Sequence, residues 1–227
     1  MLITLRNVLS GHEIKQYRQY FANLNWLDGA QSAGQQALSV KQNEQLDPKD
    51  KITQQLGDHI LQALANSPQF VSAALPLKIF PPMFNRYQNG GYYGWHVDNA
   101  IRIIPDTPVR LRTDLSATLF LNDPEEYEGG ELCVKDHYGE HRVKLSAGDL
   151  VLYSSTSLHQ VTPVTKGQRV ASFFWVESMI RDHELRDILY DLDQSIQSLG
   201  TGSGIENPDV VNLSALYHRL IRLNVDT

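Results

Sequence analysis

The feature that most constrains the fold is a change of sequence period near residue 77. Between residues 77 and 178 the chain consists of short runs rich in β-branched and aromatic residues, separated by turn residues such as Gly90-Gly91 and Gly129-Gly130. The runs cover residues 77–80, 116–121, 131–135, 141–145, 149–153 and 169–176. Many short strands at this spacing indicate an antiparallel sandwich or barrel. We therefore predict a mainly β core over residues 77–178.

The residues before this core have helical period. Ser10 and Glu13 have the spacing of a capping box, which predicts a helix from there to about residue 22. Asp47-Pro48 has the pattern of an N-cap followed by proline at the first helical position, and apolar residues at helical spacing come next. A second helix is therefore expected over residues 48–65. Residues 29–44 are polar and rich in Gly, Gln and Ser, which predicts a loop.

After residue 178 the period is helical again. Gly200–Gly204 is expected to be a flexible break between two helices, each with one apolar stripe. The stripes consist of Leu185, Ile188, Leu189, Leu192 and Ile196, then Leu213, Leu216, Tyr217, Leu220 and Ile221. The predicted chain is α+β: an N-terminal helical region (1–76) packs on the β core (77–178), and a small C-terminal helical appendage (179–227) follows. The two stripes could also serve a homodimer.

Composition excludes several function classes. The 227 residues carry a formal net charge of −6, which gives no reason to expect a nucleic-acid partner. Cys133 is the only cysteine, so no intrachain disulfide can form. The first residues lack the apolar region of a signal peptide, and no apolar stretch is long enough to span a bilayer. We therefore expect a cytoplasmic protein without a membrane partner.

A candidate metal site lies in the aromatic segment 92–99. His96 and Asp98 are two residues apart, and such residues point to one face of an extended strand. One more neutral imidazole would complete the two-histidine, one-carboxylate facial triad, which leaves three positions of iron(II) open. The pair alone is a weak signal, because a surface histidine near an aspartate is usually just solvated. The preceding Gly-Gly turn and the surrounding aromatic residues favour the rim of a pocket.

His159 is the best candidate for the third ligand. It follows the predicted strand that ends at Tyr153, and it is the only histidine placed between two predicted core strands late in the β region. The other histidines fall on predicted helices, where a helix-surface role is the better interpretation, or at a predicted hairpin turn. They are His12, His59, His137, His141, His183 and His218.

Arg169 follows His159 by ten positions, across a turn at Lys166-Gly167. A hairpin of this length brings the arginine beside the strand that carries the histidine and points it toward the interior. An unpaired buried guanidinium would be very costly, so it needs a carboxylate partner. Either an acidic side chain of the protein or a dicarboxylate cosubstrate would provide one.

Together, His96-x-Asp98, His159 and Arg169 resemble the pattern of iron(II)/2-oxoglutarate dioxygenases of the prolyl 4-hydroxylase type, and more narrowly the bacterial PKHD-type hydroxylases. The resemblance extends over the whole chain and implies a double-stranded β-helix, which is a jelly roll. The segments that carry it are Phe84–Tyr87, Gly90–Asn99, Gly129–Glu131, Ala147–Tyr153 and Arg169–Trp175.

The resemblance also implies roles for single residues. His96, Asp98 and His159 would bind iron(II), and Arg169 would bind the distal carboxylate of 2-oxoglutarate. Tyr87 is a weaker candidate for a hydrogen bond to the cosubstrate, and a core tyrosine is its alternative role. Many relatives have a serine two residues after the basic residue. Here that position is Ala171, while Ser172 is expected to point to the other face.

The implied reaction uses dioxygen to hydroxylate an unknown small-molecule or peptidyl substrate and releases succinate and carbon dioxide. Prolyl and lysyl side chains are the substrates that the family name suggests, and L-ascorbate is a further cofactor candidate. We expect aromatic and basic residues to line the substrate mouth: Tyr92, Tyr93, Trp95, Arg102, Arg110 and Arg112. The alternatives are a cupin-like metal protein or zinc hydrolase with the same ligands, and a non-catalytic sensor of iron or 2-oxoglutarate.

Overall fold

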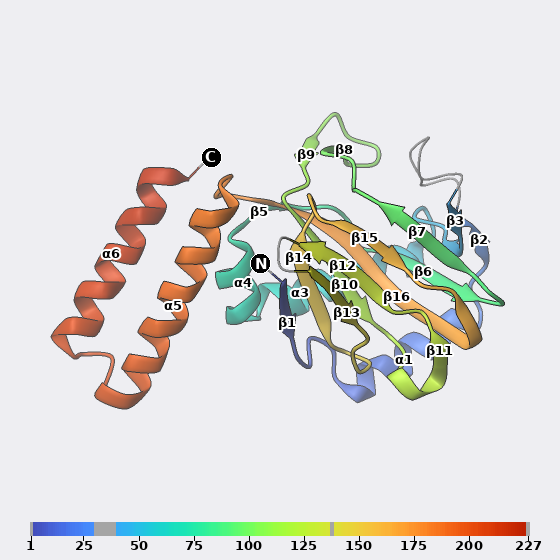
Figure 1. The fold of residues 1–227 in the computed structure, drawn as a ribbon, viewed down its shortest axis with the longest axis horizontal. Coiled ribbons are helices and arrows are strands. Elements are labelled where there is room, and N and C mark those ends of the chain that lie inside the picture. The colour runs from blue at the N-terminus through green and yellow to red at the C-terminus, as the bar shows by residue number, and fades with distance from the viewer. Residues whose placement is uncertain (1, 30–39, 137–138, 226–227) are drawn as a thin grey trace.

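Two antiparallel sheets form the body of the computed structural model, which describes residues 2–29, 40–136 and 139–225 (Figure 1). Within these residues the larger sheet has the order β1 (Leu2–Leu5), β14 (Leu150–Ser154), β10 (Leu115–Phe120), β16 (Val164–Ser178), β6 (Met83–Gln88), β4 (Glu44–Leu46) and β2 (Trp26–Asp28). Two further strands, β5 (Pro76–Ile79) and β11 (Tyr127–Gly129), pair with β16. Each of the six predicted runs overlaps a strand.

The smaller sheet has the order β13 (Gly139–Val143), β12 (Leu132–Asp136), β15 (Leu158–Val161), β7 (Tyr92–His96) and β3 (Lys41–Gln42). Tyr87 and Phe120 of the larger sheet pack in one buried cluster with Leu132, Val134 and Val161 of the smaller sheet. A separate hairpin of β8 (Ile101–Ile103) and β9 (Arg110–Arg112) projects beyond the sheets in Figure 1. The two facing sheets confirm the predicted jelly roll.

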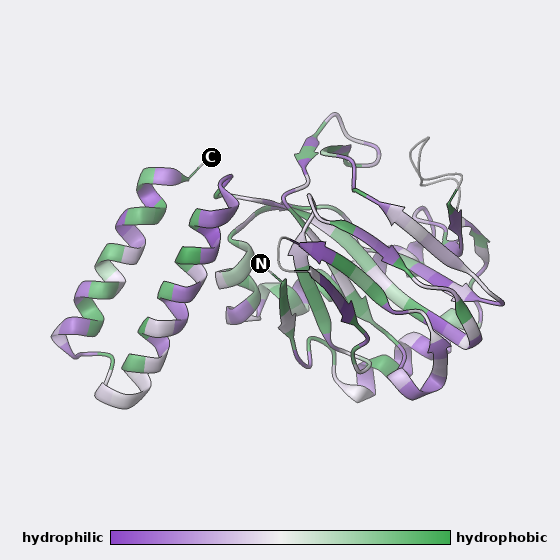
Figure 2. Cartoon of the chain, in the orientation of Figure 1, coloured by the Kyte–Doolittle hydropathy of each residue, from purple (hydrophilic) through white to green (hydrophobic). Residues whose placement is uncertain are grey.

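Helices cover the outer face of the larger sheet. Val170, Phe174 and Val176 of β16 belong to the largest buried cluster, together with residues of α1 (Gly11–Phe21), α3 (Lys51–Ala65) and α4 (Pro68–Ala74). Figure 2 shows the hydrophobic residues concentrated along the central strands. Because side chains alternate along a strand, Arg169 and Trp175 point to the opposite face, toward the smaller sheet. The pleat of β16 therefore separates a helix-covered core from the interior of the jelly roll.

The capping box of the first helix is confirmed. The Ser10 hydroxyl accepts a hydrogen bond from the Glu13 amide, and the Glu13 carboxylate accepts one from the Ser10 amide. The predicted N-cap at Asp47 is wrong, because the Asp47 side chain accepts a hydrogen bond from the Lys49 amide in the turn before the helix. Asp50 is the N-cap and accepts hydrogen bonds from the amides of residues 52 and 53, so α3 begins three residues later than predicted.

Two other local predictions need correction. Part of the predicted loop at 29–44 lies outside the described residues, but Lys41–Gln42 and Glu44 form strands β3 and β4. Strands of two or three residues have no readable period and are stabilised by their longer partners, β7 and β6. Gly200 does not break the helix either. Helix α5 (His183–Ser203) continues through it and ends at Gly204, whose φ of 87° is unfavourable for residues with a side chain.

The two C-terminal helices lie side by side at one end of the molecule, beyond α4 (Figure 1). Apolar residues of both predicted stripes pack together, because Leu189 of α5 and Tyr217 of α6 (Pro208–Asn224) belong to one buried cluster. Ser72 of α4 donates a hydrogen bond to Asp193 of α5 at 2.5 Å, which attaches the pair to the body. The division of the chain at residues 76 and 178 stays a prediction. No helix within the described ranges combines the length and hydropathy that crossing a bilayer requires.

Candidate metal and cosubstrate site

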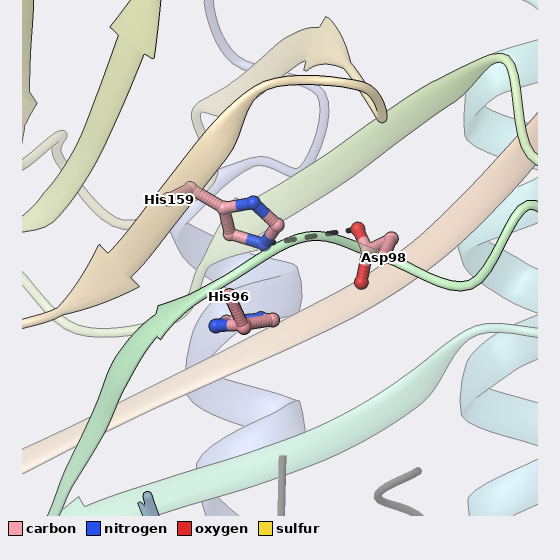
Figure 3. Close-up of side chains that lie close together, drawn as sticks. All are labelled: His96, Asp98 and His159. Carbon is pink, nitrogen blue, oxygen red and sulfur yellow. Dashed lines mark ion pairs between the residues drawn. The ribbon is translucent and has the colours of Figure 1, made fainter. Parts of the chain in front are cut away.

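Three side chains that are distant in the sequence meet at the facing ends of β7 and β15. His96 and His159 are direct partners in the register of these strands, and their ring centroids are 4.2 Å apart. Asp98 lies two residues beyond the end of β7, with one carboxylate oxygen 3.7 Å from His159 Nε2. One potential ligand atom from each residue lies within 4.8 Å of the others, and Figure 3 shows the three side chains converging. The group could hold a metal ion.

Backbone carbonyls fix both imidazoles in the form that ligates metals. His96 Nδ1 lies 2.7 Å from the Gly94 carbonyl oxygen, and His159 Nδ1 lies 2.9 Å from that of Ser157. A carbonyl oxygen can only accept a hydrogen bond, so each Nδ1 carries a proton, which leaves Nε2 as the ring nitrogen that can bind a metal. This second hydrogen bond of a histidine is a regular companion of metal ligation in proteins.

A β-bulge determines which residues of β7 reach the interior. His96 pairs with His159, but Tyr93 pairs with Val161, so β7 has one extra residue between these two positions. A bulge redirects the side chains that follow it. Tyr93 and His96 consequently face the same cavity, although they are three residues apart, and their rings stack at 3.5 Å between centroids.

Asp98 is held as a carboxylate by its neighbours. The Ser116 hydroxyl donates a hydrogen bond of 2.6 Å to Asp98 Oδ2 and lies 2.8 Å from the Ser155 hydroxyl. Burial alone would raise the pKa of Asp98, but His159, Ser116 and the indole of Trp175 together lower it below its usual value. Ser116 has no signal in the sequence, because it comes from β10, eighteen positions further along the chain.

Burial also keeps His96 neutral. Removal from water and the neighbouring His159 together lower the pKa of His96 to about 4, against the opposing effects of the Gly94 carbonyl and Asp98. A neutral imidazole is the form that binds a metal ion, and a proton would compete with the metal for Nε2. At neutral pH the cluster therefore includes the neutral imidazole of His96 and the carboxylate of Asp98.

We expect acid to destabilise the chelator-treated protein partly through His96. Its pKa is about 4 when folded and about 6.5 when exposed, so the unfolded chain binds more protons between these values. The corresponding stability is complete above about pH 6.5 and is lost as the pH falls toward 4, at most about 3 kcal/mol. Urea denaturation at pH 7 and pH 4.5 measures the loss. His96→Gln should lose less stability than the wild type, and an equal loss would contradict the prediction.

Arg169 is buried, and within the part of the chain that the structure describes it forms no ion pair with an acidic side chain. It lies opposite Tyr87 in the register of β16 and β6 and is only 1% exposed. Among the residues that the structure describes, none forms a hydrogen bond to its Nε or Nη2 atoms. Its guanidinium lies 5.1 Å from the ring centroid of Phe120 and 5.4 Å from that of Tyr87. Of the two alternatives left open by the sequence, the internal salt bridge is thus not formed within the described residues.

Gly130 explains why a Gly-Gly pair precedes β12. Its φ is 65°, and a Cβ atom at this position would lie 3.1 Å from Arg169 Cδ and 2.8 Å from Val164 Cγ2. A side chain there would therefore be strained and would press on the stem of the arginine. The glycine leaves the space that Arg169 occupies.

One cavity contains all four predicted functional residues. Its volume is about 610 Å³, a figure that includes its open mouth. Tyr87, Tyr93 and Arg102 also line it. Burial raises the pKa of Tyr87, so its phenol stays protonated and can donate a hydrogen bond. Ala171 leaves no hydroxyl beside Arg169, and the Ser172 hydroxyl donates instead to the Met83 carbonyl.

The other predicted mouth residues do not line this cavity. Arg112 forms an ion pair with Asp114 at 2.7 Å and donates a hydrogen bond to the Ser178 carbonyl. Arg110 is exposed on the same strand. The ring of Trp95 lies 4.2 Å from Lys135 Nζ, and Tyr92 pairs with residue 42 of β3.

Sequence reasoning missed several cavity residues. Phe173 and Trp175 could have been predicted, because they lie an even number of positions after Arg169 on the same strand and so share its face. Tyr153, at the end of β14, packs edge-on against His159 with 5.2 Å between ring centroids. Lys41 had no signal, since it lies in the segment predicted to be a loop, and Gln45 comes directly after that segment.

Comparison with known proteins identifies two matching family models and several similar sequences. The model of the 2OG-Fe(II) oxygenase superfamily matches residues 82–177, which contain all four functional candidates. The model of the PKHD-type hydroxylase C-terminal domain matches residues 183–226, which cover α5 and α6. PKHD-type hydroxylases of Burkholderia cenocepacia and Saccharophagus degradans are 51% and 52% identical to this chain, and each match covers 98% of both chains.

Solved structures show the same fold at lower identity. A prolyl-4-hydroxylase of Pseudomonas putida matches with a TM-score of 0.51 and 21% identity, covering 78% of this chain and 92% of its own. The viral collagen prolyl hydroxylase of Paramecium Bursaria Chlorella virus-1 matches with a TM-score of 0.54 and 17% identity, covering 78% and 96%. At these identities the likeness concerns the fold, and it agrees with the jelly roll described above.

Proposed function

The chain belongs to the PKHD-type hydroxylases of the 2OG-Fe(II) oxygenase superfamily, and from this membership we propose that His96, Asp98 and His159 bind iron(II) while Arg169 binds 2-oxoglutarate. One observation carries the proposal most directly. A buried guanidinium without an acidic partner in the described part of the chain lines the same cavity as the His-Asp-His cluster. Binding of a metal ion alone would not require the Arg169 guanidinium. A dicarboxylate that chelates the metal would require it, because its second carboxylate needs a positively charged partner.

The donor set fits iron(II). Two imidazole Nε2 atoms and one carboxylate form the facial triad of non-haem iron oxygenases, which leaves metal positions open for other ligands. Hydrogen bonds from the two Nδ1 atoms and from Ser116 to Asp98 orient all three donors before any metal arrives. This pre-orientation reduces the entropy that metal binding would otherwise cost.

The surroundings of Arg169 fit the distal carboxylate of 2-oxoglutarate. The planar fork of a guanidinium matches a carboxylate with two parallel hydrogen bonds. Phe120 and Tyr87 flank the fork with ring faces, and Tyr87 adds a neutral phenol that can donate to the same ligand. Ala171 supplies no hydroxyl here, so we assign any additional donor to Tyr87.

Bound iron(II) and 2-oxoglutarate supply the activation of dioxygen, with 2-oxoglutarate converted to succinate and carbon dioxide and one oxygen atom transferred to a C–H bond of the substrate. The residues of this chain hold the reactants in place and exclude water. Phe173, Trp175 and Tyr153 give the cavity apolar walls around the metal ligands. Arg169 orients the cosubstrate so that its keto-acid end faces the cluster.

The identity of the substrate stays a prediction. Prolyl and lysyl side chains are the candidates suggested by the family, and L-ascorbate is the additional cofactor that we propose. A cytoplasmic location and a homodimer formed through the C-terminal helices are also predictions. The absence of nucleic-acid and membrane partners is expected from the net charge of −6 and from the hydropathy of the chain.

Anaerobic addition of iron(II) and then 2-oxoglutarate tests the proposal. We expect a visible charge-transfer band only when both are present, because the band requires the keto acid to chelate the metal. Succinate in place of 2-oxoglutarate is the control and should give no band. Admission of dioxygen should then produce succinate from 2-oxoglutarate. A missing band would reject the cosubstrate site, and a band without succinate would favour the non-catalytic sensor.

A further inference from the structure

A second guanidinium lines the cavity, at a different place from Arg169. Arg102 lies in the middle of β8, and its guanidinium is 3.5 Å from the ring centroid of Trp175 and 5.7 Å from that of Phe80. Its Nε atom is buried and has no hydrogen-bond partner among the described residues. Stacking on an indole satisfies the face of a guanidinium but not the N–H groups at its edge. The edge of Arg102 is therefore available to a ligand.

The alternation of β8 is the reverse of what packing alone would select. Ile101 is 53% exposed and Ile103 is 62% exposed, while Arg102 between them turns toward the cavity. A hairpin that merely covers an apolar interior would place its isoleucines inward and its arginine in water. The register of β8 instead directs a cation to the active-site cavity, at the expense of two exposed isoleucines.

Arg112 on the paired strand shows how an arginine of this hairpin is satisfied structurally. Its guanidinium pairs with Asp114 at 2.7 Å and lies 3.8 Å from Glu177. Arg102 has no such ion pair within the described residues. The carboxylate whose charge acts on Arg102 is Asp98, which already accepts a hydrogen bond from Ser116 and belongs to the candidate metal cluster. Within the described residues, ion pairs therefore satisfy Arg112 but not Arg102.

The position of Arg102 separates it from the cosubstrate arginine and brings it close to the metal. Trp175 lies six residues from Arg169 along β16, which corresponds to about 20 Å of strand. The same indole hydrogen-bonds to Asp98, so a single side chain separates Arg102 from a metal ligand. A ligand held by Arg102 would consequently approach the cluster from the side opposite to the distal carboxylate of 2-oxoglutarate.

We propose that Arg102 binds a carboxylate of the substrate, so that this hydroxylase acts on a carboxylic acid whose oxidised C–H bond lies a few bonds from the acid group. The proposal rests on the proposed function, because it assumes that Arg169 takes the cosubstrate. The planar fork of Arg102 matches a carboxylate, and its stack on Trp175 keeps the plane of that fork fixed. A bound carboxylate would also form the ion pair that Arg102 lacks within the described residues.

Acetate is a suitable probe because it offers the carboxylate alone. The anaerobic protein with iron(II) and saturating 2-oxoglutarate is titrated with sodium acetate at constant ionic strength, and intrinsic tryptophan fluorescence is recorded, since Trp175 lies directly under Arg102. Acetamide is the neutral control probe. Arg102→Met removes the fork, Arg102→Lys keeps the charge without it, and Arg110→Met is the matched control on the same hairpin, where the side chain is exposed.

We expect a saturable response to acetate and none to acetamide. The dissociation constant for acetate should rise at least about tenfold in Arg102→Met, which is ~1.4 kcal/mol, and should stay unchanged in Arg110→Met. The dissociation constant of Arg102→Lys should lie between those of the wild type and Arg102→Met. The lysine variant supplies the measurement if the methionine variant does not fold. Inorganic phosphate, titrated in the same way, should bind more weakly than acetate.

Four results would overturn the inference. The first two are that acetate does not bind saturably up to about 100 mM, and that the wild type and the Arg102 variants bind it equally well. The third is that phosphate binds more tightly than acetate. The fourth is that Arg102→Met loses about tenfold in 2-oxoglutarate affinity. The last would make Arg102 a cosubstrate residue. The charge-transfer band distinguishes this failure from that of the proposed function. If the band never forms, the cosubstrate site itself is wrong, whereas a normal band with no acetate response rejects only the role of Arg102.

Discussion

Replacement of Asp98 by alanine is expected to lower iron(II) affinity and succinate formation by more than about 100-fold, because loss of an outer hydrogen-bond partner of a metal ligand already costs about 10–100-fold and loss of the ligand itself must exceed this. The carboxylate is the only anion of the cluster. Its removal therefore takes away both a donor atom and the negative charge that compensates the metal. Iron content after anaerobic loading and the rate of succinate formation measure the two effects.

Ser116→Ala provides a graded comparison. This variant keeps the carboxylate but removes the 2.6 Å hydrogen bond that orients it, so we expect a loss of about 10–100-fold. His183→Ala is the control, because that histidine is exposed at the start of α5 and should leave iron binding unchanged. Wild-type iron content in Asp98→Ala, or an equal loss in the His183 control, would refute the assignment of the ligands.

The second large effect concerns Arg169. In Arg169→Met the KM for 2-oxoglutarate should rise by about 30-fold to several thousand-fold, since loss of one member of a buried charge pair costs about 2–5 kcal/mol at 1.4 kcal/mol per tenfold. The turnover rate at saturating cosubstrate should change much less, because the lost contact exists before and during the reaction. Steady-state kinetics with varied 2-oxoglutarate separates the two parameters.

Arg169→Lys keeps the charge but loses the two-pronged fork, so its KM should lie between those of the wild type and the methionine variant. Arg142→Met is the matched control, because Arg142 is paired with Glu131 and Glu140 on the surface. Removal of an unpaired buried cation should not lower the free energy of unfolding of the ligand-free protein. A KM within threefold of the wild-type value would show that another group binds the cosubstrate.

The sequence-based placement of Arg169 and His159 agrees with their positions on β16 and β15. The alternation of β16 is sufficient to direct Arg169 inward, and His159 could be selected by its place between two strands. The convergence of His96 and Asp98 was predicted from an unbroken strand, yet β7 contains a bulge and ends at His96. The pair converges because Ser116 and Trp175 hold Asp98 in place beyond the strand. Such long-range contacts leave no local pattern.

The basic residues near the predicted substrate mouth show the same limit. Arg102, Arg110 and Arg112 share one segment and one residue type, and only their register in the hairpin distinguishes them. Asp114 lies two residues after Arg112, so their ion pair could have been recognised from the spacing on an extended chain. The inward direction of Arg102 could not, because two neighbouring isoleucines suggest the opposite orientation.

The two arginines that line the cavity have a consequence for the persistence of the protein in the cell. Two guanidiniums that lack acidic partners within the described residues make the ligand-free fold less stable than it would be with anions bound. A ligand that binds only the folded chain at 100 times its dissociation constant stabilises it by about 2.7 kcal/mol. Proteases act on transiently opened chains, so we expect degradation to slow when such a ligand is abundant. The amount of this hydroxylase in the cell should then rise with the supply of that ligand.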